Sequence, residues 1–76
     1  MARAQTKHLV VCLKNEGYPA SLEKRKIYIA LPDADAERRG LTRVIDESGE
    51  DYLYPRAFFQ SITLPTAIRK AVLVAA

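Results

Sequence analysis

Apolar and polar residues alternate in several short runs of this chain, which is the pattern of half-buried β-strands. Five runs carry it, at residues 8–14, 27–31, 41–46, 51–54 and 60–64. In the first run Leu9, Val11 and Leu13 alternate with Val10 and Cys12, so that both faces are rather apolar. We therefore expect a central or partly covered strand.

Residues 46–50 lie between the third and fourth runs and have the composition of a tight turn. Four of the five are Asp, Glu or Ser, and Gly49 can take a positive φ angle at little cost. Flanked by two strand-like runs, this segment predicts a β-hairpin. Pro55 then ends the fourth strand because it has no backbone N–H, and Phe58 and Phe59 carry enough apolar area to anchor the return.

Two registers of this hairpin are open. If residues 48 and 49 form a two-residue turn, Leu53 faces the core, while Tyr52, Tyr54 and Arg43 share the outer face. If residues 46–49 form a type I turn with a glycine bulge, pairing slips by one residue and Tyr54 turns inward. The apolar pattern favours the first register, with Leu53 inside.

The remaining segments are less regular. Residues 33–40 are charged and rich in alanine, and with no large apolar side chain we expect an exposed loop there. Near the end, Thr63 and Pro65 fit the start of a helix whose apolar face contains Ile68, Ala71, Val72 and Ala75. The alternative is a tail strand at residues 72–74 that pairs with an open edge.

Length and composition bound the class of protein. Seventy-six residues make one domain, which we expect to comprise a flexible lead-in at residues 1–7 and a single folded domain at residues 8–76. Hydrophobic residues at 49% and charged residues at 28% are ordinary globular values. With one cysteine and no apolar leader, we expect a cytoplasmic protein without a disulfide framework. The longest apolar run, 71–76, falls short of the roughly 20 residues that span a bilayer.

The net charge is +3, but the charges are not uniformly placed. Basic residues cluster at 24–26, 38–39 and 69–70, whereas Asp46, Glu47, Glu50 and Asp51 make the predicted hairpin tip acidic. An acidic tip would repel phosphate at one end of the domain. The basic excess is therefore weak evidence for a nucleic-acid partner.

Residues 49–59, with the sequence GEDYLYPRAFF, resemble the late segment of SH3 domains, where a hairpin runs into a proline, a short 3₁₀ turn, an aromatic residue and the last strand. Pro55 and Phe58 match that proline and aromatic residue. More loosely, residues 21–29 resemble the basic diverging turn of SH3 domains, and residues 43–55 are similar to small bacterial proteins of unassigned role. The resemblance implies a mainly β fold, a small five-stranded SH3-like antiparallel barrel with a short C-terminal helix. The chain lacks tryptophan and an Ala-Leu-Tyr-Asp-Tyr-like run, so most of the SH3 peptide-binding aromatic residues are missing.

Catalytic and metal chemistry find little support in the residues. His8 and Cys12 are the single histidine and cysteine, and on a strand they would stand roughly 13 Å apart, too far to cooperate. Residues 33–37 begin like a calcium loop, but Arg38 and Val44 occupy the places of the required glycine and glutamate. We expect a protein that is not an enzyme, with no metal and no cofactor.

Binding through aromatic side chains is the leading expectation. The predicted surface for a protein or peptide partner consists of Tyr18, Tyr28, Arg43, Tyr52, Tyr54 and Pro55. The alternative is a small barrel that binds nucleic acid through Lys24, Arg25, Lys26, Arg38 and Arg39 beside aromatic residues. We expect a monomer, or a weak homodimer formed through residues 71–76, and no membrane partner.

Overall fold

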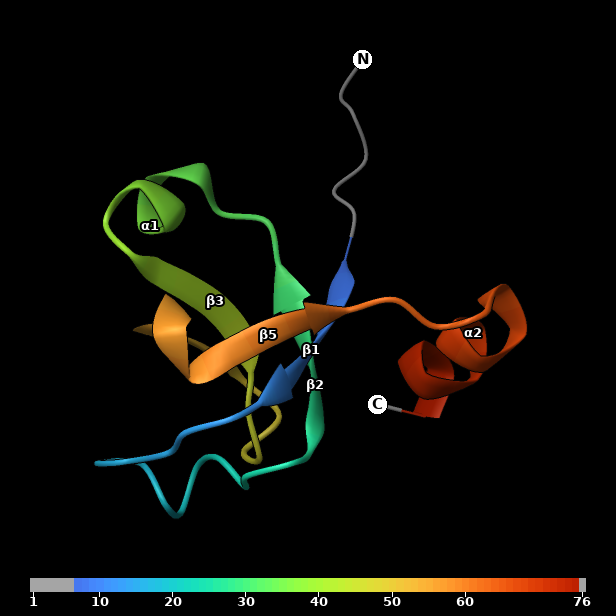
Figure 1. Cartoon of the computed structure of the whole chain (residues 1–76), viewed down its shortest axis with the longest axis horizontal. Helices are drawn as coiled ribbons and strands as arrows, with labels where there is room; N and C mark the ends of the chain where they lie inside the picture. Colours follow the sequence, from blue (N-terminus) through green and yellow to red (C-terminus); the bar gives the residue numbers. More distant parts are fainter. Residues whose placement is uncertain (1–6, 76) are drawn as a thin grey trace.

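Five antiparallel strands form one sheet in the computed structural model, which describes residues 7–75 (Figure 1). The strands are β1 His8–Cys12, β2 Ile27–Leu31, β3 Leu41–Ile45, β4 Asp51–Pro55 and β5 Phe59–Ile62. Their order is β4-β3-β2-β1-β5, so the sheet is not closed and β4 and β5 are its edges. The mainly β class and all five strands are confirmed. Apart from Lys7, the expected lead-in lies outside the described residues.

The main core cluster lies on one face of the sheet. Its buried members are Val10, Cys12, Leu22, Tyr28, Ala30, Val44 and Tyr54, with Phe58 and Phe59 packed against them. β1 lies between β2 and β5, and its consecutive residues Leu9 and Val10, which point to opposite faces of the sheet, are both buried. The prediction of a central or partly covered strand is therefore confirmed.

The hairpin uses the register that the apolar pattern did not favour. Val44 pairs with Tyr52 and Thr42 with Tyr54, so the preference for Leu53 inside was wrong. The Gly49 amide donates to the Asp46 carbonyl at 2.9 Å, and Gly49 has a φ of +86°. This is the turn with a glycine bulge, which adds one residue to the connection and turns Tyr54 inward.

The expected loop at residues 33–40 contains a short helix, α1 Ala34–Arg38. The Asp33 carboxylate accepts a hydrogen bond from the Ala36 amide at 3.0 Å, which caps the first turn. Ala36 is fully buried, so one small side chain suffices to dock the helix. The prediction failed because it counted only large apolar residues as possible anchors.

A 3₁₀ turn, η1 Arg56–Phe58, follows β4 directly after Pro55. The Arg56 amide donates to the Gly40 carbonyl at 2.9 Å, and this bond continues the β3–β4 ladder by one further pair. The Phe58 carbonyl then accepts from the Leu13 amide at 2.7 Å. The proline bend therefore carries the chain from the β4 edge to β1, and the 3₁₀ turn after the proline agrees with what the SH3 resemblance implied.

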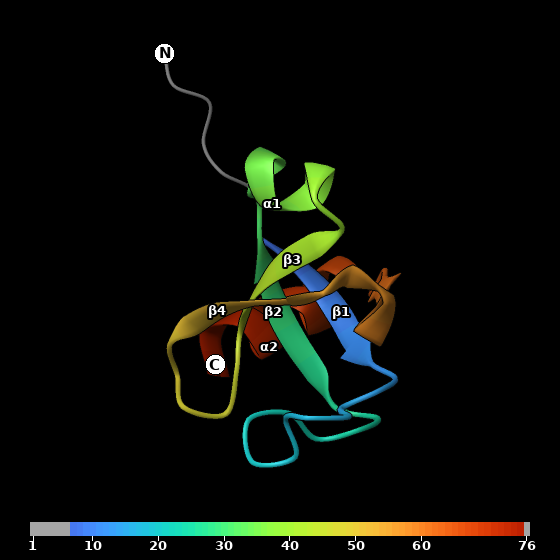
Figure 2. The same ribbon diagram turned by 90° about the vertical axis from the view of Figure 1, so that its left-hand side faces the viewer.

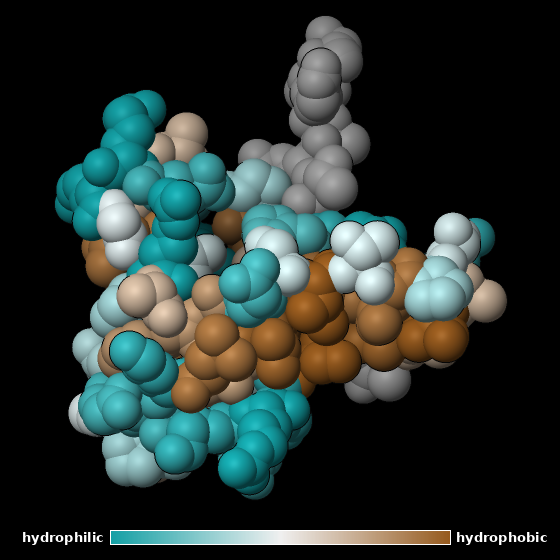
Figure 3. All heavy atoms as spheres, in the orientation of Figure 1, coloured by the Kyte–Doolittle hydropathy of each residue, from teal (hydrophilic) through white to brown (hydrophobic). Residues whose placement is uncertain are grey.

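The closing segment forms a helix, α2 Thr66–Ala75, rather than the alternative edge strand. It lies on the side of the sheet away from α1 (Figures 1 and 2). Val74 is 84% exposed and Ile68 51% exposed, and apolar surface continues from β5 to α2 (Figure 3). Over residues 7–75, no helix has the length and apolar character that crossing a membrane requires.

Candidate functional site

The loop at residues 13–26 and the hairpin turn at residues 46–50 lie at the same end of the sheet, here called the hairpin-tip end (Figure 2). Leu22 anchors the loop in the core, and the Glu47 amide donates to the Ser21 carbonyl at 3.1 Å. Between the two segments lies an aromatic hollow of about 360 Å³, lined by Tyr18, Ser21, Asp46, Ser48, Tyr52, Leu53 and Tyr54. Two segments far apart in sequence therefore build one concave surface.

Two tyrosine rings line this hollow and remain accessible to a partner. Tyr18 is 41% exposed and Tyr52 49% exposed. The Tyr18 ring meets Tyr54 edge to face at a centroid distance of 4.9 Å and Phe58 at 6.1 Å. The Tyr52 hydroxyl donates to Glu50 at 3.0 Å. Both rings have neighbours that restrict them before any partner arrives.

Asp46 is a buried carboxylate in the wall of the aromatic hollow. It accepts hydrogen bonds from the Ser48 amide at 2.9 Å, from the Ser48 hydroxyl at 2.6 Å and from the Tyr54 hydroxyl. Burial raises the pKa of Asp46, but the hydrogen bonds from Ser48 and Tyr54 outweigh it, so that the pKa lies below its usual value. Burial, followed by the hydrogen bond to Asp46, raises the pKa of Tyr54 to about 12. Asp46 is thus held as an anion and Tyr54 as a neutral donor.

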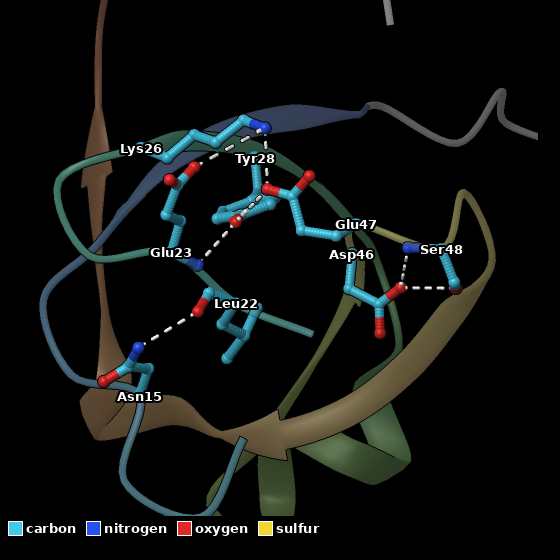
Figure 4. Close-up of polar contacts among 8 residues, drawn as sticks. All are labelled: Asn15, Leu22, Glu23, Lys26, Tyr28, Asp46, Glu47 and Ser48. Atoms are coloured by element: carbon cyan, nitrogen blue, oxygen red, sulfur yellow. Dashed lines mark hydrogen bonds and ion pairs between the residues drawn. The ribbon is translucent and has the colours of Figure 1, made fainter. Parts of the chain in front are cut away.

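A second polar network joins the loop to the hairpin (Figure 4). The Glu47 carboxylate accepts hydrogen bonds from the Lys26 ammonium and from the Tyr28 hydroxyl, each at 2.6 Å. The Tyr28 oxygen also accepts from the Glu23 amide at 2.7 Å. The Lys26 and Tyr28 hydrogen bonds lower the pKa of Glu47, while burial and the Glu47 contact raise the pKa of Tyr28. This network fixes the loop against the turn.

The structure brings together only part of the predicted aromatic surface. Tyr18 and Tyr52 share the hollow, but Tyr28 and Tyr54 are buried and point their hydroxyls at carboxylates. Because the register differs, Arg43 lies on the opposite face of the hairpin from both Tyr52 and Tyr54. The expected patch of one arginine and two tyrosines on a common face is therefore not formed.

The other predicted surface residues are engaged elsewhere. Arg43 pairs with Asp33 at 2.8 Å and with Asp51 at 3.0 Å. Pro55 is half-buried at the end of β4, opposite Leu41. Neither side chain contributes to the aromatic hollow, whose lining comes from the loop and the hairpin.

The basic residues of the nucleic-acid alternative do not gather on one surface. Lys24, Arg25 and Lys26 lie in the loop at the hairpin-tip end, and Lys26 pairs with Glu47. Arg38 and Arg39 lie in and next to α1, at the other end of the sheet (Figure 2), and Arg38 pairs with Asp35. A strand of nucleic acid would meet two separate basic groups, with the acidic hairpin tip beside one of them.

The single thiol is buried, and the described carboxylates do not gather into a metal-binding cluster. Cys12 is fully buried, its thiol donates to the Lys14 carbonyl at 3.2 Å, and burial raises its pKa, which makes it a poor nucleophile. Within residues 7–75, no cluster of three or more His, Cys, Asp or Glu side chains could hold a metal ion.

Sequence reasoning missed the role of Asp46. The sequence places Asp46 in an exposed acidic tip. In the structure Asp46 is buried and organises the hairpin turn through three hydrogen bonds. The signal was present in the Asp-x-Ser spacing, because an aspartate commonly accepts a bond from the backbone two residues on. The hollow itself depends on contacts between distant segments and had no local signal.

No family model, no curated protein and no solved structure matches this chain. What it does must be argued from its own geometry.

Proposed function

We propose that this chain is a non-enzymatic module that binds a protein or peptide segment in the aromatic hollow. The observation that carries the proposal is the pair of accessible rings, Tyr18 and Tyr52, on either side of a concavity whose wall holds the buried Asp46 carboxylate. Tyrosine offers a large flat contact with few rotatable bonds, so it loses little entropy on binding.

Charge indicates the kind of segment that fits. Asp46, Glu47, Glu50 and Asp51 lie in or beside the hairpin turn, and of these Glu47 already has Lys26 as a partner. Asp51 pairs with Arg43, and Asp46 is buried with donors of its own. A segment that carries arginine would complement Glu50, and its proline residues would pack against the tyrosine rings. The proposed partner is therefore an extended segment that contains arginine and exposed proline residues.

We also propose that the sheet is an SH3-like barrel. Two features support this: the strand order, in which β5 lies beside β1, and the 3₁₀ turn η1 that separates β4 from β5 after Pro55. A cytoplasmic location fits the single thiol, Cys12, which is free and buried.

The first experiment titrates the labelled protein with a capped synthetic peptide of alternating arginine and proline and follows backbone amide shifts by NMR. The largest shifts are expected at Tyr18, Ser48 and Tyr52. Tyr52→Ala should weaken binding by about tenfold, because it removes one of the two rings. Tyr52→Phe is the matched control and should retain most of the affinity. Shifts that avoid this end of the molecule would refute the proposed surface.

Nucleic-acid binding remains the alternative, and salt separates it from the aromatic proposal. A labelled oligothymidine is titrated at rising salt, and steeply falling affinity together with amide shifts at Lys24 and Arg25 would favour that alternative. Weak binding with no response at these two residues favours the aromatic hollow.

A further inference from the structure

A larger hollow lies at the end of the sheet opposite the hairpin tip, here called the α1 end. Its volume is about 830 Å³, within the usual range for ligand sites. The lining residues come from β1, α1, the start of β3, η1 and β5, and include Val10, Phe59, Gln60 and Ser61. Val10 and Phe59 supply apolar area, whereas most of the others are polar.

The free edge of β5 lines this hollow. β5 is the last strand of the sheet and pairs with β1 alone, and Gln60 and Ser61 are exposed. An edge strand presents backbone groups that have no partner in the sheet, and these groups can hydrogen-bond to an added strand. The hollow and the strand edge are therefore parts of one site.

The register shows which backbone groups face the open edge. The Leu13 amide donates to the Phe58 carbonyl, and hydrogen-bonded pairs alternate along an antiparallel ladder in steps of two residues. In the same register, Gln60 faces Val11 and bonds to it, so the backbone of Ser61 points away from β1. The Phe59 amide donates to the Arg56 carbonyl. The Ser61 N–H and the Phe59 carbonyl are thus directed to the open edge.

The Ser61 carbonyl also faces this edge. It has one contact, from the side-chain amide of the exposed Gln60 at 3.4 Å. That distance is long for a hydrogen bond, so an incoming backbone N–H could replace the amide at little cost. Donor and acceptor are thus both available on the same residue, which is what a pairing strand requires.

We propose that the α1 end binds an extended peptide, which adds a strand to the free edge of β5. The backbone of the peptide pairs with Ser61, and alternate side chains enter the hollow toward Val10 and Phe59. A peptide rich in threonine and valine suits this site, because β-branched residues favour the extended conformation and the hollow is apolar at its base and polar at its rim.

The opposite edge strand, β4, is less suited to the same role. The Arg56–Gly40 hydrogen bond sets its register, in which the backbones of Leu53 and Pro55 face outward. Pro55 has no N–H to donate, so this edge offers an interrupted row of donors. Peptide addition is therefore specific to β5.

The test uses a capped synthetic peptide of alternating threonine and valine, flanked by lysines for solubility, and follows the labelled full chain by NMR. We expect shifts at Phe59, Gln60 and Ser61, together with slower solvent exchange of the Ser61 amide. A matched peptide that is N-methylated on alternate residues, on the edge that faces β5, should bind about tenfold more weakly because its backbone donors are lost. Equal binding of the two peptides would overturn the proposal.

Substitutions at one position separate backbone from side chain. Ser61→Pro removes the outward N–H and should weaken binding by about tenfold, whereas Ser61→Ala keeps the backbone and should bind as the parent does. Tyr52→Ala, at the other end, should leave this binding unchanged. Loss of binding in Tyr52→Ala, or shifts confined to Tyr18 and Tyr52, would refute a separate site at β5. If Ser61→Pro fails to fold, the comparison between the two peptides decides.

Discussion

The two ends of the sheet differ in how far their polar groups find partners within the protein. At the hairpin-tip end, Asp46, Glu47 and the tyrosines Tyr28 and Tyr54 satisfy one another through short hydrogen bonds, and only the small aromatic hollow is left. At the α1 end, the larger hollow separates β5 from β3 and η1, and the backbone of Ser61 lacks a strand partner. The hairpin-tip end is filled by its own side chains, while the α1 end keeps a hollow large enough for a ligand.

This difference affects how stability is distributed. Buried polar groups stabilise a fold when all of them are satisfied, and removal of one partner leaves the others exposed to the full desolvation penalty. Polar groups that line a hollow open to water do not face this desolvation penalty. We therefore expect substitutions at the hairpin-tip end to change the free energy of unfolding, and substitutions at the α1 end to change binding.

The largest expected effect is that of Asp46→Ala. It deprives Tyr54 and both donors of Ser48 of their acceptor, and should lower the free energy of unfolding by about 3 kcal/mol. Urea denaturation followed by circular dichroism measures this change. Gln60→Ala is the control at the α1 end and should stay within about 0.5 kcal/mol. Similar losses in both variants would remove the distinction between the ends.

A smaller effect is expected for Tyr54→Phe, which removes one hydroxyl and keeps the ring. The free energy of unfolding should fall by about 1–2 kcal/mol, because Asp46 loses a buried donor but keeps Ser48. Tyr52→Phe is the matched control, since its hydroxyl meets Glu50 on the exposed surface, and should cost less than about 0.5 kcal/mol. If the two variants are equally stable, the Asp46–Tyr54 contact contributes little.

Acid should weaken the hairpin-tip end selectively. The pKa values of Asp46 and Glu47 are lowered on folding, so their contribution is complete above the unfolded values of 3.8 and 4.5 and is lost as pH falls through the lower folded values. Urea midpoints measured from neutral to acidic pH should therefore fall, and Asp46→Asn should show a shallower fall. The pKa of Tyr54 is raised from 10.0 to about 12, so its contribution is lost as pH rises between these values.

The smallest expected effect on stability is at α2, which belongs to neither end. Val74→Glu should change the free energy of unfolding by less than about 0.5 kcal/mol, because this side chain is already exposed to water. It tests the expected weak homodimer, since a charge in the apolar surface of α2 should abolish any rise of mass with concentration. Light scattering at two concentrations, with Lys70→Glu as the control, distinguishes self-association from a strict monomer.

Much of the fold could be predicted because its signals are local. Alternation located the five strands, the turn residues before Glu50 located the hairpin, and Pro55 marked the bend into η1. α1 was missed because its anchor, Ala36, is too small to register in an apolar pattern. The helical spacing at the end of the chain predicted α2 correctly against its strand propensity.

The candidate site was less predictable because it depends on register and on distant contacts. One residue of slip in the hairpin moved Tyr54 into the core and placed Arg43 on the other face. Tyr18 acquired its place beside Tyr52 from the fold of a long loop, which periodicity does not describe. The free edge of β5 follows from the strand order, which local sequence leaves open.

The one cysteine of the chain is Cys12, a fully buried residue at the end of β1. A thiol reagent can reach the Cys12 sulfur only after β1 separates from its neighbours. The labelling rate of the unaltered protein therefore measures how often the sheet opens. A peptide strand bound to β5 would slow this reaction. The labelling rate therefore reports occupancy of the β5 edge without any introduced probe.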